Sequence, residues 1–388
     1  MAEAPSASIE EAAVVSLAQR LVRFASPQTE RMEAEPAVQN FIGDCVVPLL
    51  AERGLHGRRD RMGNLLIELG PQQADRSLML MTYAMTHPAS AMRDPYGGEI
   101  LDLPEGRAIR GRGISEQKGA LAAAIAAVDQ IRQSKSLRGR FVFALSSAGE
   151  TGRHDAAATV LDTLGYTPEL GIVALGTNNL VALGNKGRVD IEVIVHGKAT
   201  HSSTPWNGVN AIDGARLVLD RLAALPVGDD AHPALGKATL TATAVESFPK
   251  ATHTIQNEVR LTFDRRLLPR QDPETAFAQI SHAVEGIDGP WRVEAKRGAY
   301  MYPCEISRDG PLFTAIARSR AEAGLSPPET LYSHSALDAG FLAARGCESA
   351  MWGPGRMEQF HSDEECLLVS ELVAGARDYA RLLQSHLC

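Results

Sequence analysis

Carboxylate, imidazole and guanidinium groups that could do chemistry are concentrated in a few short segments of this 388-residue chain. Carboxylate oxygens and imidazole nitrogens are the donors that zinc and related divalent metals prefer, and an arginine can hold a substrate carboxylate through two parallel hydrogen bonds. The segments, in chain order, are GRGISEQKGALAA (111–123), AGETG (148–152), GNKGR (184–188), VIVHGKATHSSTPWNGVNAI (193–212), FDRRLLP (263–269) and GPGRMEQFHSDEE (353–365). Each segment alone is a weak signal, but together they extend over nearly the whole chain.

In order and spacing these segments resemble metallopeptidase family 20, which includes acetylornithine deacetylase, succinyl-diaminopimelate desuccinylase, aminoacylase and the glutamate carboxypeptidases. The resemblance implies an α/β fold, with a zinc-exopeptidase-like catalytic domain and an inserted α+β dimerisation (lid) domain. It also implies two zinc ions roughly 3.5 Å apart, bridged by one carboxylate, and a glutamate that activates the bridging water. Fold alone does not fix function, so the site has to be compared residue by residue.

One of the two metal positions has lost the ligands that the resemblance implies. The family pattern Gly-His-x-Asp-x-x-Pro aligns without a gap on TYAMTHP, at 82–88. Tyr83 therefore replaces the first ligand histidine, and Met85 replaces the aspartate that orients it. The carboxylate normally found after the next strand falls at Leu175 or Gly176.

The other metal position keeps its ligand types. Glu116 replaces the bridging aspartate and retains the carboxylate, although its side chain is one methylene longer. The Glu-Glu pair of the family becomes Gly149-Glu150, so the general base is absent while the neighbouring ligand remains. His361 retains the final histidine. The resemblance thus implies that Glu116, Glu150 and His361 are a complete set of three metal ligands with one open position, the form of a catalytic mononuclear site.

Two interpretations of this trio stay open. It can hold one divalent metal, such as zinc, manganese or cobalt, or it can be a metal-free hydrogen-bonded cluster of two carboxylates and an imidazole. His87 lies close to the family ligand position and could compensate, although a histidine before a proline is more often an ordinary polar loop residue. In either case Glu116 and Glu150 are candidates for catalysis as well.

The substrate side of the site matches the family better. His201 matches the histidine that reaches the partner subunit's active site and polarises the scissile carbonyl. Arg266 matches the arginine that grips a substrate carboxylate, and Asn210 matches a residue that lines the same pocket. The alternative for each is a structural polar residue, but the surrounding motifs favour a functional role. Arg265, one step along the strand from Arg266, should point to the opposite face.

The segment YSHSALDAG, at 332–340, takes the place of a glycine-rich stretch before a Thr-Asp pair that lines the family pocket. Asp338 is retained, whereas His334 and Ser335 are departures. These two could supply acid, base or nucleophile chemistry, so His334 is a candidate for catalysis and Ser335 for substrate binding. Neighbouring serine and histidine residues are also common by chance.

Composition and charge narrow the class of protein. Hydrophobic residues make up 44% and charged residues 22%, which is typical of a globular enzyme. The net charge of −8 argues against nucleic acid or an anionic membrane as the main partner. The five cysteines lack CxxC spacing and indicate neither a disulfide framework nor a thiolate zinc site. The sequence shows no signal-peptide pattern and no apolar run near the ~20 residues of a membrane span, so we expect a cytoplasmic protein.

The hydrophobic pattern predicts the elements that must position these residues. Buried-looking strands alternating with helices indicate a parallel α/β sheet, and alternating strands in the middle of the chain indicate an antiparallel α+β insertion. We predict a catalytic domain of residues 1–180 and 298–388, with an inserted domain at 181–297. The predicted strands start at Leu65, Leu78, Phe141, Gly171, Val189, Thr239 and Glu258, and the best-marked helices cover 12–24, 210–225, 274–284 and 368–383.

From these observations we predict a cytoplasmic, homodimeric amidohydrolase or deacylase. It would cleave a C–N amide or peptide-type bond of a small carboxylate-bearing substrate, with one metal or none. A metal-independent lyase or isomerase on the same scaffold, and a non-catalytic binding protein, are the alternatives. The retained His201, Asn210 and Arg266 favour an enzyme, whereas the missing base at Gly149 favours non-hydrolytic chemistry.

Overall fold

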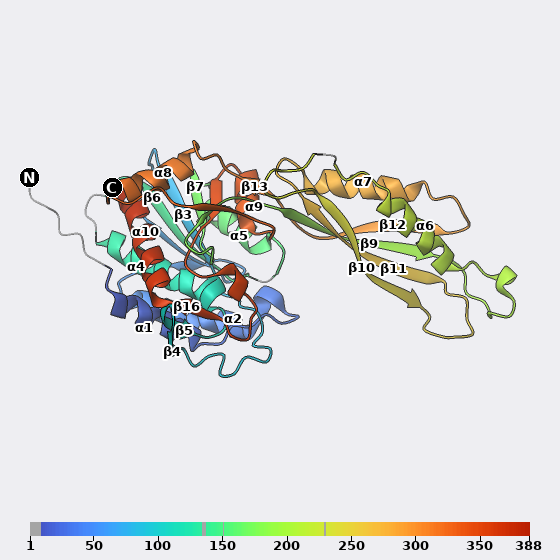
Figure 1. Cartoon of the computed structure of the whole chain (residues 1–388), viewed down its shortest axis with the longest axis horizontal. Coiled ribbons are helices and arrows are strands. Elements are labelled where there is room, and N and C mark those ends of the chain that lie inside the picture. Colours follow the sequence, from blue (N-terminus) through green and yellow to red (C-terminus); the bar gives the residue numbers. More distant parts are fainter. Residues whose placement is uncertain (1–8, 134–136, 150, 229) are drawn as a thin grey trace, which may run out of the picture. The chain divides into compact units, whose positions relative to one another are not determined.

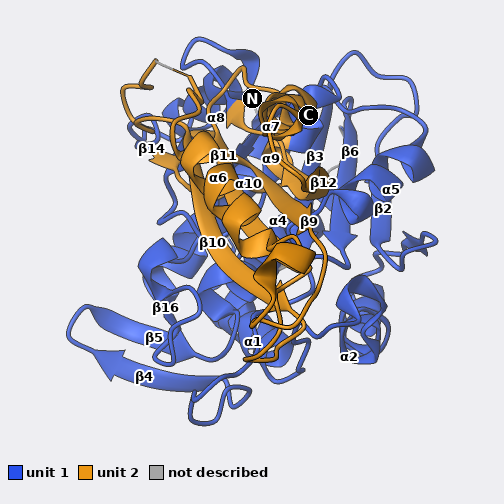
Figure 2. Cartoon of the chain, turned by 90° about the vertical axis from the view of Figure 1, so that its right-hand side faces the viewer, with its two compact units in different colours: residues 1–183, 305–331, 341–388 blue, residues 184–304, 332–340 orange. Residues whose placement is uncertain are grey.

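The computed structural model describes residues 9–133, 137–149, 151–228 and 230–388, and the chain divides into two compact units (Figure 2). Unit 1 contains residues 1–183, 305–331 and 341–388, and unit 2 contains residues 184–304 and 332–340. Residues 332–340, which the sequence analysis assigned to the catalytic domain, thus cluster with the insertion. The short strands β8 (Val181–Asn185), β13 (Cys304–Glu305) and β14 (Thr330–Ser333), and helix α9 (Asp338–Ala344), lie where the chain passes from one unit to the other.

Unit 1 is built on a six-stranded sheet with a parallel centre, as the sequence predicts. In spatial order the strands are β1 (Arg58–Arg59), β2 (Leu65–Leu69), β6 (Arg140–Ser146), β3 (Ser77–Tyr83), β7 (Leu170–Val173) and β15 (Glu348–Met351). The last four run parallel to one another, while β2 joins β6 antiparallel. The central strands are buried almost throughout, because helices cover a parallel sheet on both faces.

The helices of unit 1 pack around this sheet (Figure 1). Helix α4 (Gly119–Arg132) is rich in alanine and almost completely buried, because its small side chains let neighbouring helices approach closely. Those neighbours are α1 (Glu11–Val22) and α10 (Val369–Leu387), and α8 (Pro311–Ala321) packs on α10. No helix within the described residues combines the length and apolarity needed to cross a membrane.

The second helix expected from the sequence, through Val38 and Leu49, is divided in three. It consists of α2 (Pro36–Asn40), a π-helical turn η2 (Phe41–Val46) and α3 (Val47–Ala51). Pro48 lacks a backbone N–H and cannot continue the α-helical hydrogen-bond ladder, which explains the irregular turn before it. Unit 1 also contains α5 (Asp155–Leu164) and a small sheet of β4 (Glu99–Leu103), β5 (Gly106–Arg110) and β16 (Cys366–Leu368).

Unit 2 is a four-stranded antiparallel sheet with two helices on one face, as predicted for the insertion. The strand order is β10 (Thr239–Phe248), β11 (Glu258–Leu267), β9 (Gly187–His196) and β12 (Arg292–Met301), and the helices are α6 (Ala211–Ala223) and α7 (Pro273–Glu285). Every second residue of β9, from Val189 to Val195, faces the helices and forms the core. Arg188, Asp190 and Glu192, which alternate with the first of these residues, lie on the opposite face and are only partly buried.

The buried His386, near the end of α10, should make the stability of the fold sensitive to acid. Its side chain is 6% exposed, and burial, with Arg76 and Arg318 nearby, lowers the pKa of His386 from 6.5 to about 4. Between these pH values the unfolded chain binds a proton that the folded chain excludes, so stability falls as the pH is lowered. We expect this histidine to remove roughly 3 kcal/mol from the free energy of unfolding over that window. Urea titrations across the window should show a correspondingly smaller loss for His386→Leu, and equal losses in the two proteins would contradict the prediction.

Candidate functional site

The carboxyl ends of the four parallel strands define one edge of the unit 1 sheet. In open α/β sheets, ligands bind at this edge, where the loops after the strands meet. The loops that follow β3, β6, β7 and β15 carry the motifs of Met85, Gly149, Gly176 and His361, and the Glu116 motif follows β5. Backbone hydrogen bonds tie them together: Ala84 donates to Ser146, Gly176 to Glu116 and Thr177 to Gly353, over 2.9–3.0 Å.

Two predicted ligands, Glu116 and His361, come together at this edge. Glu116 lies on the π-helical turn η3 (Ile114–Lys118), its side chain is nearly buried, and its Oε2 atom is 3.4 Å from Nε2 of His361. His361 has a φ of 60°, a left-handed conformation that is uncommon outside glycine and that clusters at functional sites. The ring of His87 stacks on that of His361, with 4.0 Å between centroids. The third predicted ligand, Glu150, lies outside the described residues.

Glu365 holds the backbone that carries Glu116. Its carboxylate is fully buried and accepts hydrogen bonds from the backbone N–H groups of Gly113, Ser115 and Glu116, and from Arg112, over 2.8–3.2 Å. Burial raises the pKa of the Glu365 carboxyl, and these donors oppose that effect. The sequence does not predict this role, because nothing in it distinguishes Glu365 from the other acidic residues after His361.

The residues that align with one of the two implied metal positions are buried. Tyr83 is 1% exposed, Met85 is 0% exposed and Leu175 is 3% exposed. A phenol, a thioether and an isobutyl group now occupy the positions where the resemblance implies a histidine and two carboxylates. Burying such groups is favourable, whereas leaving a cluster of polar ligands there without a metal would be costly.

Backbone atoms also occupy the space of a side chain at two positions where the resemblance implies a carboxylate. A Cβ atom at Gly149 would overlap the carbonyl oxygen of Met85, and one at Gly176 would overlap the carbonyl oxygen of Ser115. The same Ser115 oxygen blocks any Cβ at Gly355, whose φ of 117° also excludes other residues. Neither Gly149 nor Gly176 can therefore be exchanged for an acid without moving the backbone.

The described residues do not fit the two-zinc centre that the resemblance implies. At one implied position the buried Tyr83, Met85 and Leu175 stand in place of a histidine and carboxylates, and none of them is a donor that zinc prefers. Among the residues that the structure describes, no group of three or more histidine, cysteine, aspartate and glutamate side chains is placed to hold a metal. A single site at Glu116 and His361 would need the undescribed Glu150 to complete it.

The remaining site candidates lie in unit 2. Arg266 donates from Nε and Nη2 to the two carboxylate oxygens of Asp264, over 2.8 and 3.0 Å. Arg265 points to the opposite, buried face, where it donates to three backbone carbonyls and where burial lowers its pKa to about 10. The side chain of Asn210 accepts the N–H of Ile212 and caps α6, a structural role that the sequence analysis gave as the alternative.

The other unit 2 candidates are exposed. His334 and Ser335 lie on a bend after β14, where the backbone N–H of Ser335 donates to the hydroxyl of Ser333. His201 lies on the loop between β9 and α6, with Nδ1 of its ring turned toward Ser203. Within unit 1 the structure thus brings together Glu116, His361 and His87, while the substrate-side candidates belong to unit 2.

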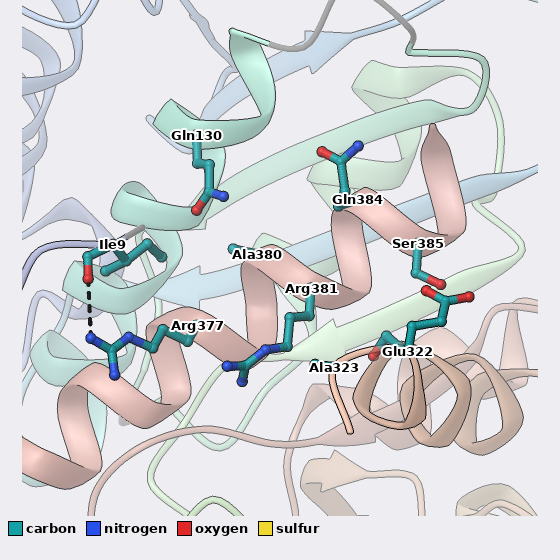
Figure 3. A pocket seen from close by; sticks show the side chains of 10 residues that line it. Ile9, Gln130, Glu322, Ala323, Arg377, Ala380, Arg381, Gln384 and Ser385 are labelled. Carbon is teal, nitrogen blue, oxygen red and sulfur yellow. Dashed lines mark hydrogen bonds between the residues drawn. The ribbon is translucent and has the colours of Figure 1, made fainter. Parts of the chain in front are cut away.

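A cavity of about 330 Å³ elsewhere in unit 1 is separate from this edge (Figure 3). It lies among α4, α8 and α10, and Arg377 at its rim donates to the carbonyl of Ile9. Its lining includes Ser385, close to the end of α10. At that end the carbonyl of Leu387 accepts hydrogen bonds from the N–H groups of residues 138 and 139, which lie just before β6. The cavity therefore lies toward the ends at which the parallel strands begin.

The two units and the polar edge of the unit 1 sheet define an α/β exopeptidase-type scaffold. Residues 88–385 match the family model described as Peptidase family M20/M25/M40, and the chain belongs to this family of hydrolases. This match confirms the resemblance, and with it the predicted fold class and the prediction of an enzyme of the hydrolase class.

Individual relatives agree with this assignment. The chain is 25% identical over 356 residues to a succinyl-diaminopimelate desuccinylase of Cereibacter sphaeroides, covering 87% of this chain and 91% of the relative. It is 27% identical over 289 residues to a probable carboxypeptidase of Aspergillus fumigatus, covering 72% of this chain but only 63% of that relative's length.

Solved structures match almost the whole chain at low identity. A metallo-carboxypeptidase of Sulfolobus solfataricus has a TM-score of 0.74 at 15% identity, covering 96% of this chain and 99% of its own. The aminopeptidase PepT of Bacillus cereus has a TM-score of 0.73 at 17% identity, covering 97% and 98%. At such identities these matches show the shared fold alone.

Proposed function

We propose that the protein hydrolyses a C–N amide or peptide-type bond in a small substrate that carries a carboxylate, with one metal or none. The observation that carries the proposal is the nearly buried Glu116 beside His361 at the carboxyl edge of the sheet, on loops that match the family motifs. The named relatives are carboxypeptidases, a desuccinylase and peptidases, which gives the non-hydrolytic enzyme and the binding protein no support.

The proposed roles are those of the family residues that these positions match. Glu116 and His361 form a carboxylate–imidazole pair suited to orienting a water and to receiving a proton from it. His201 donates a hydrogen bond to the scissile carbonyl, and Arg266 holds the substrate carboxylate. His334 and Ser335, both exposed, are proposed to line the substrate's path rather than to form a nucleophile pair.

A substrate panel tests this proposal. N-acyl amino acids and dipeptides would be offered with free and with amidated carboxyl ends, and amine release would be followed by mass spectrometry. We expect turnover of free-carboxylate members only, and a loss of about a hundredfold or more in Glu116→Gln. Glu364→Gln, at an exposed neighbouring carboxylate, is the matched control and should keep full activity. Substrate consumption without amine release would refute hydrolysis.

We predict at most one tightly held divalent metal per chain, at Glu116, Glu150 and His361. The reason is that Tyr83 and Leu175 replace the donors of the other position. Elemental analysis should be made on protein purified without chelators or nickel affinity. Two equivalents of zinc would contradict the prediction, and one equivalent should disappear in Glu116→Gln.

Arg266→Lys should raise the KM of a carboxylate substrate about tenfold or more, because lysine cannot make a two-pronged contact. The inhibition constant of the matching carboxamide, measured by competition, should not change. Arg260→Lys is a suitable control, since Arg260 lies on the same strand and donates to Glu258 in the same i, i+2 arrangement. An unchanged KM in Arg266→Lys would remove this role.

A homodimer formed through unit 2 is part of the proposal. β10 is an edge strand of the unit 2 sheet, and Val245 on it is 61% exposed. Trp206 and Ile212 are further large apolar side chains exposed in the same unit. An open strand edge with exposed apolar side chains is suited to pairing with a second copy around a two-fold axis.

A further inference from the structure

We infer that Ser203 is a positioning residue that holds His201 as the neutral imidazole with its proton on Nε2. The inference rests on the proposed function, in which His201 donates to the scissile carbonyl. It assigns a chemical reason to the serine two residues after that histidine. The sequence motif HSS did not reveal it, because either serine could have served.

The geometry of one contact determines the tautomer. The backbone nitrogen of Ser203 donates its N–H to Nδ1 of His201 over 3.1 Å, and the Ser203 hydroxyl lies 2.8 Å from the same atom. A backbone N–H can only donate, so Nδ1 must be an acceptor and carries no proton. A neutral imidazole has one N–H, which is therefore on Nε2.

The surrounding loop keeps this contact in place. Its base is closed by two hydrogen bonds between Lys198 and Val209, over 2.8 and 2.9 Å. Ser202 donates its backbone N–H to the carbonyl of His253, so this group joins the loop to a neighbouring segment and is not available to the His201 ring. The N–H and the hydroxyl of Thr204 both point to the carbonyl of His201.

The tautomer matters because the two ring nitrogens have opposite effects on a carbonyl oxygen. When water adds to the amide carbon, the π-electron pair of the C=O bond moves to oxygen, and the Nε2–H group stabilises the negative charge without transferring its proton. The other tautomer would present a lone pair to that oxygen and repel it. One such donor typically accelerates amide hydrolysis about 10²–10³-fold. The exposure of His201 leaves Nε2 accessible to a substrate.

The tautomer can be read directly by long-range ¹H–¹⁵N correlation on protein labelled at histidine. His201→Gln identifies the resonances of His201 among the eleven histidines. We expect, in mildly alkaline buffer, a protonated, pyrrole-type Nε2 and an unprotonated, pyridine-type Nδ1. A protonated Nδ1, or an even mixture of the two forms, would overturn the inference. This reading needs no substrate, so it stands or falls separately from the proposed hydrolysis.

Kinetics then test whether Ser203 matters for turnover. Ser203→Ala keeps the backbone N–H but loses the hydroxyl, and we expect kcat to fall about threefold to tenfold with KM unchanged. The minor tautomer should become visible in the spectrum, and Ser203→Thr should restore both readouts. Ser202→Ala is the matched control and should change neither. If Ser203→Ala and Ser202→Ala behave alike in both measurements, Ser203 is not a positioning residue.

Discussion

A mixture of His201→Ala and Glu116→Gln should regain about a quarter of wild-type activity, although each variant alone should be nearly inactive. In the proposed dimer His201 of one chain completes the partner's site. A homodimer of either variant therefore has a substituted residue in both of its sites. Random exchange makes half of the dimers mixed, and each mixed dimer contains one site with both residues intact. Half of the dimers are mixed, and half of the sites in each mixed dimer work, so one quarter of all sites should be active.

The appropriate control is a mixture of His201→Ala and His201→Gln, in which no site is restored and activity should stay at the level of the components. Subunit exchange has to be proven independently, for example by native mass spectrometry with one isotope-labelled chain. If exchange is complete and the first mixture stays inactive, His201 acts within its own chain or has no role. If the protein sediments as a monomer at micromolar concentration, the shared site is excluded before any kinetic measurement.

Restoring the missing base by Gly149→Glu should give no zinc-dependent deacylase activity and should also destabilise the fold. The overlap with the Met85 carbonyl arises at Cβ, so any side chain at residue 149 forces the two loops apart. Overpacking of this kind typically costs about 1–3 kcal/mol. A base is useful only if a polarised water lies within hydrogen-bond reach, and the metal position that would help to hold that water is filled by Tyr83 and Leu175.

Two alanine variants separate the steric effect from the chemistry. Gly149→Ala should lower the free energy of unfolding almost as much as Gly149→Glu, because both place a Cβ atom against the same carbonyl. Gly43→Ala should be tolerated, because the nearest atom to a Cβ there is 3.6 Å away, at the end of the flexible Arg59 side chain. Hydrolysis of N-acetyl amino acids by Gly149→Glu would show that the edge of the sheet is more open than the structure indicates.

Most regular elements could be predicted because their hydrophobic pattern has one clear period. The helix predicted at 274–284 is α7 (Pro273–Glu285), and the strand predicted from Phe141 lies within β6. Strand β12 (Arg292–Met301) was missed because its bulge near Arg297 and its exposed, charged residues interrupt the alternation. The β4–β5 hairpin was missed for a related reason, since both strands are only partly buried.

The site was harder to predict than the fold. Family motifs locate Glu116 and His361, but they do not reveal that the rings of His87 and His361 stack, because that contact joins loops far apart in the sequence. The hydrogen bonds of the buried Glu365 also join segments that are far apart in the sequence. For Asn210 the motif suggests a residue that lines a pocket, whereas the structure shows its side chain capping a helix.

The carbonyl oxygen of Ser115, held between Gly176 and Gly355, has a consequence for the history of this site. A lost carboxylate can usually return by reversing one codon, provided that its space persists. Here the Ser115 carbonyl oxygen occupies the place of a Cβ atom at Gly176, so an acid introduced at that residue would displace the backbone. Regaining an acid at residue 176 would therefore need a second change that moves the Ser115 carbonyl away, so single substitutions do not lead back to it.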